Sequence, residues 1–339
     1  MVDRRAAMKI IKLTVFGMFA IAAILVKSAW DTYDLARRHP APHLGIKSDP
    51  EALRLKASVR QLSAVIGRRN YRYPRGLAST AAYIRGEFRN AGYNVRAQSY
   101  FVHPPGFGEL RMENFIATIP AASSGAPVLV IGAHYDTAFE TPGADDNASG
   151  VAVLLDLARR LKDCSSRVEI RFVAYSTEEP PFFGGPEMGS AVHAQALKAE
   201  GRTVLGMVGL EMLGYYDDAK GSQKYPMLLS LFLPNTADYI GVVSNLPSRS
   251  FMKEFVNGFR PPQGTRLIAA SLPEWVGEIT LSDHRNYWDE GFPAVMVTDT
   301  AFLRNVHYHQ TSDTPEKLDY RRMADVTAGL EHAIRSLVE

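Results

Sequence analysis

The chain contains a single cysteine among its 339 residues, Cys164. One cysteine cannot form an internal disulfide, and it rules out a zinc site built from cysteine ligands. The net charge is also small, at +2, and no basic stripe is interleaved with aromatic residues, which argues against nucleic acid as a partner. With 46% hydrophobic and 22% charged residues, the composition is that of a globular protein with a large core.

Long apolar runs are scarce, and the N-terminus carries the main one, Leu13–Val26. Its basic flank consists of Arg4, Arg5, Lys9 and Lys12. If the flanking lysines snorkel, Ile10–Trp30 is long enough to cross a bilayer. Lys27 stands where a cleavable signal would need a small residue. We therefore predict an uncleaved membrane anchor at 1–30 and a linker at 31–50, with the rest outside the cytoplasm. A cleaved signal, which would yield a secreted protein, is the alternative.

Residues 51–339 are predicted to form one α/β catalytic domain. Short apolar runs alternate with amphipathic helical patterns, and this rhythm predicts a mixed, mostly parallel central sheet flanked by helices. The predicted strands are 94–102, 111–119, 128–131, 168–175, 204–210, 226–233, 239–244, 267–270 and 292–298. The predicted helices are 51–66, 79–90, 151–161, 186–200, 248–259 and 320–337.

Side chains that can bind metal follow four of these predicted strands. They include two imidazoles and three carboxylates, namely His134, Asp146, Glu179, Glu211 and His309. Open α/β sheets bind their ligands at the carboxyl ends of the strands, so we expect these residues to meet there. Zinc accepts nitrogen and oxygen ligands together. Such a set can hold two metal ions about 3.5–4 Å apart, with one carboxylate shared between them.

Six short motifs then point to a known family. They are GAHYDT (132–137), PGADDNASG (142–150), STEE (176–179), LEMLGY (210–215), SDH (282–284) and YHQTSDT (308–314). In order and approximate spacing, the chain resembles the zinc-dependent exopeptidases that include secreted bacterial leucine aminopeptidases, glutamate carboxypeptidase and glutaminyl cyclases. The resemblance runs from about residue 130 to residue 315 and says little about residues 1–75.

The resemblance implies a role for each residue. The zinc ligands would be His134, Asp146, Glu179, Glu211 and His309, with Asp146 bridging two ions. Glu178 would be the general base, and Tyr308 would donate a hydrogen bond to the developing oxyanion. Asp136 would orient His134 from behind the ligands. Asp283 would support the site in the same way, unless it belongs to a purely structural pair.

The chain departs from the family pattern at one ligand. Many aminopeptidases of this family carry Asp where this chain has Glu211, and a longer arm there would reshape one metal site. Asp145, beside the bridging carboxylate, is not expected to be a ligand. Arg304 is either a cation for a substrate carboxylate or a solvated surface residue.

These roles predict a two-zinc exopeptidase that acts on peptides, with aminopeptidase activity favoured. A glutaminyl cyclase, which is an acyltransferase with one zinc on the same fold, is one alternative. A non-catalytic ectodomain is the other. A serine hydrolase is disfavoured because neither Ser149 nor Ser190 lies in a G-x-S-x-G motif. The oligomeric state is left open.

Overall fold

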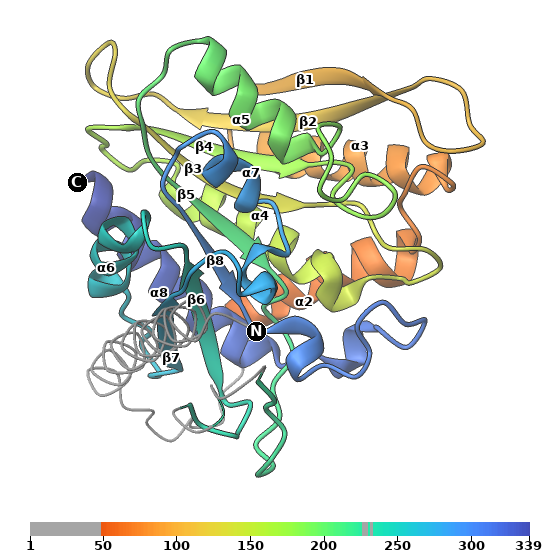
Figure 1. Ribbon diagram of the computed structural model, residues 1–339, viewed down its shortest axis with the longest axis vertical. Helices are drawn as coiled ribbons and strands as arrows, with labels where there is room; N and C mark the ends of the chain where they lie inside the picture. The colour runs from red at the N-terminus through yellow and green to blue at the C-terminus, as the bar shows by residue number, and fades with distance from the viewer. Residues whose placement is uncertain (1–48, 226–229, 231–232) are drawn as a thin grey trace, which may run out of the picture.

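A central eight-stranded sheet organises the computed structural model, which describes residues 49–225, 230 and 233–339 (Figure 1). The strands lie in the order β1-β2-β4-β3-β5-β8-β6-β7. Their bounds are β1 (Val95–Val102), β2 (Leu110–Ile119), β3 (Val128–His134), β4 (Glu169–Tyr175), β5 (Val204–Glu211), β6 (Tyr239–Ser244), β7 (Arg266–Ser271) and β8 (Ala294–Thr298). The neighbouring strands β4, β3, β5 and β8 run parallel, while β1, β2 and the β6–β8 pair introduce antiparallel contacts. The predicted mixed, mostly parallel sheet is therefore confirmed.

Helices cover both faces of this sheet (Figure 1). The larger core lies under α2 (Pro50–Arg60), α3 (Pro74–Asn90), α4 (Gly150–Leu161), α6 (Arg249–Gly258) and α8 (Tyr320–Val338). The smaller core lies under α5 (Gly189–Ala199) and α7 (Arg285–Asp289). Short helical turns complete the chain, namely η1 (Gln61–Ile66), η2 (Ala144–Ser149), η4 (Gly277–Thr280), η5 (Ala301–Leu303) and η6 (Pro315–Lys317).

Strand β3 shows why the sheet needs cover on both faces. Its side chains alternate, so that Leu129 and Ile131 enter the larger core while Val128 and Val130 enter the smaller one. Every residue of β3 is buried. A strand that is apolar on both faces is stable only between two layers of helices, which is typical of parallel sheets.

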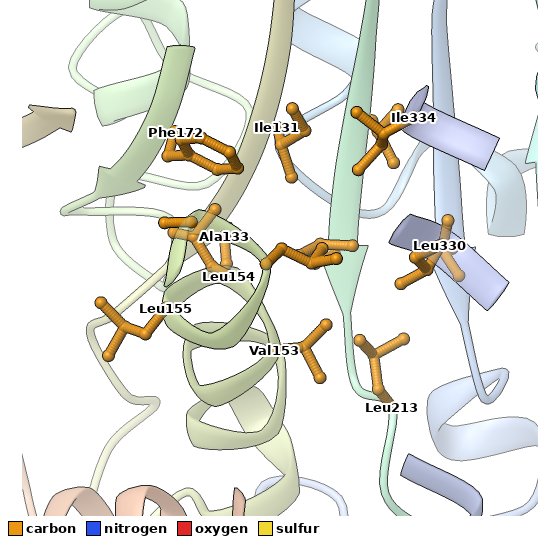
Figure 2. Close-up of a cluster of buried hydrophobic side chains, with 14 of the residues drawn as sticks. Ile131, Ala133, Val153, Leu154, Leu155, Phe172, Leu213, Leu330 and Ile334 are labelled. Carbon is orange, nitrogen blue, oxygen red and sulfur yellow. The ribbon is translucent and has the colours of Figure 1, made fainter. Parts of the chain in front are cut away.

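Helix α4 is packed on the sheet directly after the loop that carries Asp146. Figure 2 shows Val153 and Leu154 of this helix in one cluster with Ile131 and Phe172 of the strands. The helix begins at Gly150, where a Cβ would lie 2.3 Å from the side-chain oxygen of Asn147. Only glycine allows this approach, so the start of α4 is held against the end of the preceding loop.

Some element boundaries differ from the predicted ones for identifiable reasons. Helix α3 begins at Pro74 rather than at residue 79, because proline suits the first turn of a helix. Strand β3 runs on to His134, three residues beyond its predicted end at Ile131. Helix α7 was not predicted, since it spans one short turn after the SDH motif. The predicted strand 226–233 lies almost wholly outside the described residues.

The predicted anchor at 1–30 and nearly all of the linker at 31–50 also lie outside the described residues. Both therefore stay predictions. Within residues 49–225, 230 and 233–339, no helix combines the length and the apolar character needed to span a bilayer.

The core around α4 generates a first prediction. Replacing the fully buried Leu154 with Ala should lower the free energy of unfolding by about 2–5 kcal/mol, because it removes apolar contacts and leaves a cavity. The matched control is Leu53→Ala, at a leucine whose side chain is 62% exposed, which should change it by less than about 0.5 kcal/mol. Urea denaturation measures both. Equal losses for the two variants would contradict the packing described for α4.

Candidate metal centre

The central parallel strands bring the predicted ligands to one edge of the sheet. His134 is the last residue of β3, and Glu211 is the last residue of β5. Glu178 and Glu179 follow the end of β4, which is the neighbour of β3 on its other side. His309 lies in the loop that follows β8 and η5. Because β4, β3, β5 and β8 are adjacent and parallel, their carboxyl ends place all four groups together.

Asp146 lies between the two imidazoles. Its Oδ1 is 3.4 Å from Nε2 of His134, and its Oδ2 is 3.1 Å from Nε2 of His309. The first imidazole is also 3.3 Å from Oε2 of Glu211. The second is 3.3 Å from Oε2 of Glu179. The residues thus form two half-sites that share one carboxylate, which is the arrangement of centres that bind two metal ions.

The polar atoms of this cluster fit a metal ion. Four of them are buried and have no hydrogen-bond partner within the described parts of the chain, namely Nδ1 and Nε2 of His134, Oδ2 of Asp146 and Oε1 of Glu179. Buried polar atoms almost always have a partner. One ligand atom from each of these three residues lies within 4.8 Å of the others. Imidazole and carboxylate donors at this spacing can hold zinc.

Asp136 connects His134 to the glutamate pair. Its Oδ1 lies 3.5 Å from Nδ1 of His134 and accepts a hydrogen bond from the backbone N–H of Glu178 at 3.1 Å. Its Oδ2 accepts one from the backbone N–H of Glu179, also at 3.1 Å. A single carboxylate therefore holds the turn that presents the two glutamates and lies beside the imidazole ring. The orienting role of Asp136 toward His134 stays a prediction.

Asp313 is a residue whose role the motifs did not reveal. Its two carboxylate oxygens accept hydrogen bonds from the backbone N–H groups of Asp145 and Asp146, at 2.9 and 3.1 Å. Asp313 follows His309 in the same loop, so it ties together the loops that carry two of the candidate ligands. Its position inside YHQTSDT was the available signal, but the residue type alone does not distinguish this role from that of a surface aspartate. Asp145 accepts from Gly214 and belongs to neither half-site.

Negative charge is concentrated at the centre. Six carboxyl groups are buried there, those of Asp136, Asp146, Glu178, Glu179, Glu211 and Asp283. Burial raises the pKa of Glu178, and the nearby Glu179 and Glu211 add to the effect. Burial together with Asp146 raises the pKa of Glu179 to about 7. Burial opposes protonation of His309, yet Asp146 and Glu179 raise its pKa to about 10. Two protonated imidazoles would offset at most two of these six charges, whereas two divalent cations would offset four.

Tyr308 and the SDH segment flank the candidate ligands. The ring of Tyr308 stacks on that of His309, with ring centroids 3.8 Å apart. The hydroxyl of Ser282 donates to Oε2 of Glu211 at 2.6 Å. Asp283 is buried, its Oδ1 has no partner among the residues described, and burial raises its pKa to about 7. The segment therefore lies directly behind Glu211.

Arg304 contradicts one of the two interpretations drawn from the sequence. It is 5% exposed, so it is not a solvated surface residue. Its Nε donates to the side-chain oxygen of Gln223 at 2.8 Å, and its Nη1 donates to the carbonyl of Tyr239 at 2.9 Å. The guanidinium also lies over the Tyr239 ring, 4.6 Å from its centroid. These contacts hold Arg304 inside the protein, while a role toward a substrate carboxylate stays a prediction.

An apolar pocket opens beside the metal centre. It encloses about 900 Å³, including the space at its open mouth, and it shares Glu211 and Tyr308 with the centre. Its wall is largely apolar and includes Val243, Ile268, Leu272, Ile279, Met296 and Phe302. Among the described residues, no lysine, arginine or histidine lines it, and Glu278 is its second acidic residue. The pocket has the apolar lining with a few polar groups that is typical of a small-molecule site.

Known sequences share this pattern. The sequence profile of peptidase family M28 matches residues 114–334. The chain is 36% identical over 323 residues to "Uncharacterized protein YfbL" of Escherichia coli (strain K12), covering 92% of this chain and 94% of that protein. It is 30% identical over 236 residues to "Probable leucine aminopeptidase" of Trichophyton verrucosum (strain HKI 0517). That match covers 65% of this chain and 54% of the fungal protein, about half of its length.

Solved structures share the fold. An aminopeptidase from Aneurinibacillus sp. strain AM-1 has a TM-score of 0.64 at 16% identity, over 91% of this chain and 96% of that one. A glutaminyl cyclase from Fimbriiglobus ruber has a TM-score of 0.61 at 24% identity, over 88% and 99%. The matching family profile, together with the His/Asp/Glu cluster, defines the class of this protein as a metallopeptidase. Within that class, the chain belongs to peptidase family M28, as its motifs predicted.

The carboxyl groups of the centre generate a prediction for the metal-free protein. The pKa of Glu179 and that of Asp283 are raised to about 7 in the folded state, above their usual values near 4. The folded protein therefore binds more protons than the unfolded chain between these values. The contribution of these two groups to the free energy of unfolding is fully present below about pH 4. It is lost as the pH rises through about 7.

With chelator, the Tm should consequently fall between pH 5.5 and pH 8.5. Zinc should raise the Tm more at the higher pH, because it stabilises the ionised carboxylates and competes with protons at the lower one. Differential scanning calorimetry at the two pH values, with zinc or with chelator, checks this. A chelated protein that is more stable at pH 8.5 than at pH 5.5 would refute the proposed charge crowding.

Proposed function

We propose that this protein is a two-zinc aminopeptidase that removes residues from the free N-termini of peptides. The observation that carries the proposal is the pair of half-sites sharing Asp146, with Glu178 beside them. His134 and Glu211 would hold one ion, and Glu179 and His309 would hold the other. Membership of a peptidase family supports peptides as the substrate class.

Glu178 is suited to move protons because the close pairs of the half-sites involve Glu179 and Glu211 instead. Bound zinc ions would lower the pKa of a water molecule and polarise the scissile carbonyl. Glu178 then takes a proton from the attacking water and delivers it to the leaving amine. Asp136 holds the backbone of Glu178 during both transfers. Tyr308, stacked on His309, would donate a hydrogen bond from its hydroxyl to the developing oxyanion.

The pocket supports a preference for free N-termini. Its ionisable lining groups are the carboxyls of Glu211 and Glu278 and the hydroxyls of three tyrosines, and the described residues contribute no cation to it. A substrate ammonium group is attracted to such a site, whereas a substrate carboxylate is repelled. The apolar wall suits an apolar side chain on the first residue. With the predicted anchor at 1–30, these peptides would lie outside the cytoplasm.

Glutaminyl cyclisation is the second candidate, supported by the shared fold of a glutaminyl cyclase. It differs from the proposal in metal content, since the cyclase reading expects one zinc per chain and the peptidase reading expects two. A non-catalytic ectodomain is the third candidate, although the clustering of all the candidate ligands gives no sign of a lost metal site.

One experiment separates these candidates. Purified protein is assayed on leucine arylamide, on the same compound with a blocked amine, on an N-blocked dipeptide with a free carboxyl, and on a glutaminyl peptide. Each assay is run with zinc and with chelator, and zinc per chain is counted by atomic emission. We expect zinc-dependent hydrolysis of the unblocked arylamide only, with two zinc ions per chain. Turnover of the glutaminyl peptide with one zinc would favour the cyclase, and no turnover with any substrate would favour the ectodomain.

The adjacent glutamates provide a matched pair of variants. Glu178→Gln should lower kcat by about 10²–10⁴-fold or more while zinc content stays near two per chain, because only the proton acceptor is lost. Glu179→Gln makes the same chemical change one residue away, but it should reduce zinc content because it removes a proposed ligand. Metal analysis and kcat on leucine arylamide measure both effects. If Glu178→Gln left turnover intact, Glu178 would not be the base.

A further inference from the structure

A short segment between α3 and the preceding turn η1 lies against the loop that leads from His134 to the shared Asp146. This segment, Gly67–Asn70, is outside residues 114–334, which match the family profile. Arg69 within it is fully buried, with no exposed surface. Burying a guanidinium costs free energy unless its N–H groups meet acceptors. The acceptors of Arg69 therefore indicate its role.

The Arg69 guanidinium binds both ends of the loop 135–143. Its Nε donates to the carbonyl of Tyr135 at 2.8 Å, directly after His134. Its Nη1 and Nη2 donate to the carbonyls of Pro142 and Gly143, at 2.5 and 2.6 Å. A planar guanidinium can satisfy several acceptors in fixed directions at once. The distance between the two loop ends is therefore set by one rigid group.

Asn70 binds the middle of the same loop. Its side-chain amide donates to the carbonyls of Thr137 and Phe139, both at 2.9 Å. Phe139 has a positive φ of 36°, which an L residue rarely adopts without support. The Phe139 ring contacts the His309 imidazole edge to face, with ring centroids 6.1 Å apart. Asn70 therefore supports the conformation of a residue that packs against a candidate ligand of the second half-site.

Two glycines allow the segment and the loop to approach this closely. A Cβ at Gly143 would lie 3.0 Å from Nη2 of Arg69 and 2.2 Å from the carbonyl oxygen of Asp146. A Cβ at Gly76, in the first turn of α3, would lie 2.0 Å from the carbonyl oxygen of Arg68. The segment is thus fixed between α3 on one side and the metal-site loop on the other.

We propose that Arg69 and Asn70 are positioning residues for the metal centre. They hold the loop 135–143 so that His134 and Asp136 at one end and Asp146 at the other stay at metal-binding distance. The inference rests on the proposed zinc centre, although it is independent of which reaction that centre catalyses. Since Arg69 carries a positive charge, a role through geometry and a role through charge predict opposite effects on zinc affinity.

The test compares zinc affinities of the wild-type protein and four full-length variants by competition with a chromophoric chelator. Arg69→Lys keeps the charge but replaces the planar donors with a single ammonium, and Arg69→Met removes the charge. Both should weaken zinc binding by about 10–100-fold, the usual effect of losing a group that orients ligands. The control is Arg75→Met, at an exposed arginine in the first turn of α3. It should leave zinc affinity within about threefold.

If Arg69 acted through its charge alone, Arg69→Met would tighten zinc binding and Arg69→Lys would not change it. Either result would overturn the proposal. Asn70→Ala covers the case in which the Arg69 variants do not fold, because it removes two hydrogen bonds without disturbing a buried charge. It should weaken zinc binding by about 3–10-fold and speed amide hydrogen exchange at residues 137–143 in the metal-free protein. Unchanged affinity and exchange in this variant would also overturn the proposal.

The same measurements distinguish this proposal from the proposed function. Wild-type protein that binds zinc but hydrolyses no peptide would remove the aminopeptidase assignment and leave the positioning role in force. If the wild-type protein hydrolysed peptides but its zinc affinity did not change on substitution of residues 69 and 70, the positioning role would be wrong and the aminopeptidase assignment would stand.

Discussion

The structure depends on one electrostatic constraint: several carboxyl groups must be buried together beside only two imidazoles. Asp146 stands at the centre of this arrangement, because each of its oxygens faces a different histidine. Carboxylates that are buried close together repel one another strongly, because a buried environment screens their charges weakly. The surrounding hydrogen bonds to Asp136 and Asp313 hold the carboxylates in place against that repulsion. The same excess of negative charge makes the site a receptor for divalent cations.

The sheet supplies the geometry that the charges require. Because β4, β3, β5 and β8 are parallel neighbours, the groups at their ends are spaced by the regular separation of strands. The two-sided burial of β3 and the packing of α4 then keep the Asp146 loop from moving relative to His134. The packing that stabilises the core therefore also fixes the geometry of the site, as expected where functional residues are carried by rigid elements.

The departure at Glu211 is accommodated locally. Its longer side chain brings Oε2 to 3.3 Å from His134, and the hydroxyl of Ser282 holds the same oxygen at 2.6 Å. The half-site is therefore closed by an extra hydrogen bond from the SDH segment. Glu211 also forms part of the apolar pocket wall, so the choice of glutamate affects the substrate side as well as the metal side.

Much of this architecture was accessible from local pattern. Apolar runs of about four to eight residues reveal buried strands, and the order of His134, Asp146, Glu179, Glu211 and His309 after those runs predicted a common edge. The chain's membership of its family followed from six motifs, since such motifs keep the residues that chemistry demands. The strand ends and the clustering of these residues agree with that expectation, although their roles as ligands await measurement.

Other features arose only from contacts between distant segments. Arg69, Asn70 and Arg304 are ordinary polar residues in the sequence, and nothing near them indicates that they are buried. Most of their partners lie 65 to 81 positions away, because loop carbonyls become acceptors only after the sheet and helices have assembled. In a sequence, hydrophobic periodicity indicates which face of a helix or strand is buried, and motifs indicate reactive groups. Hydrogen bonds to backbone carbonyls leave no such record, since every residue carries the same carbonyl group.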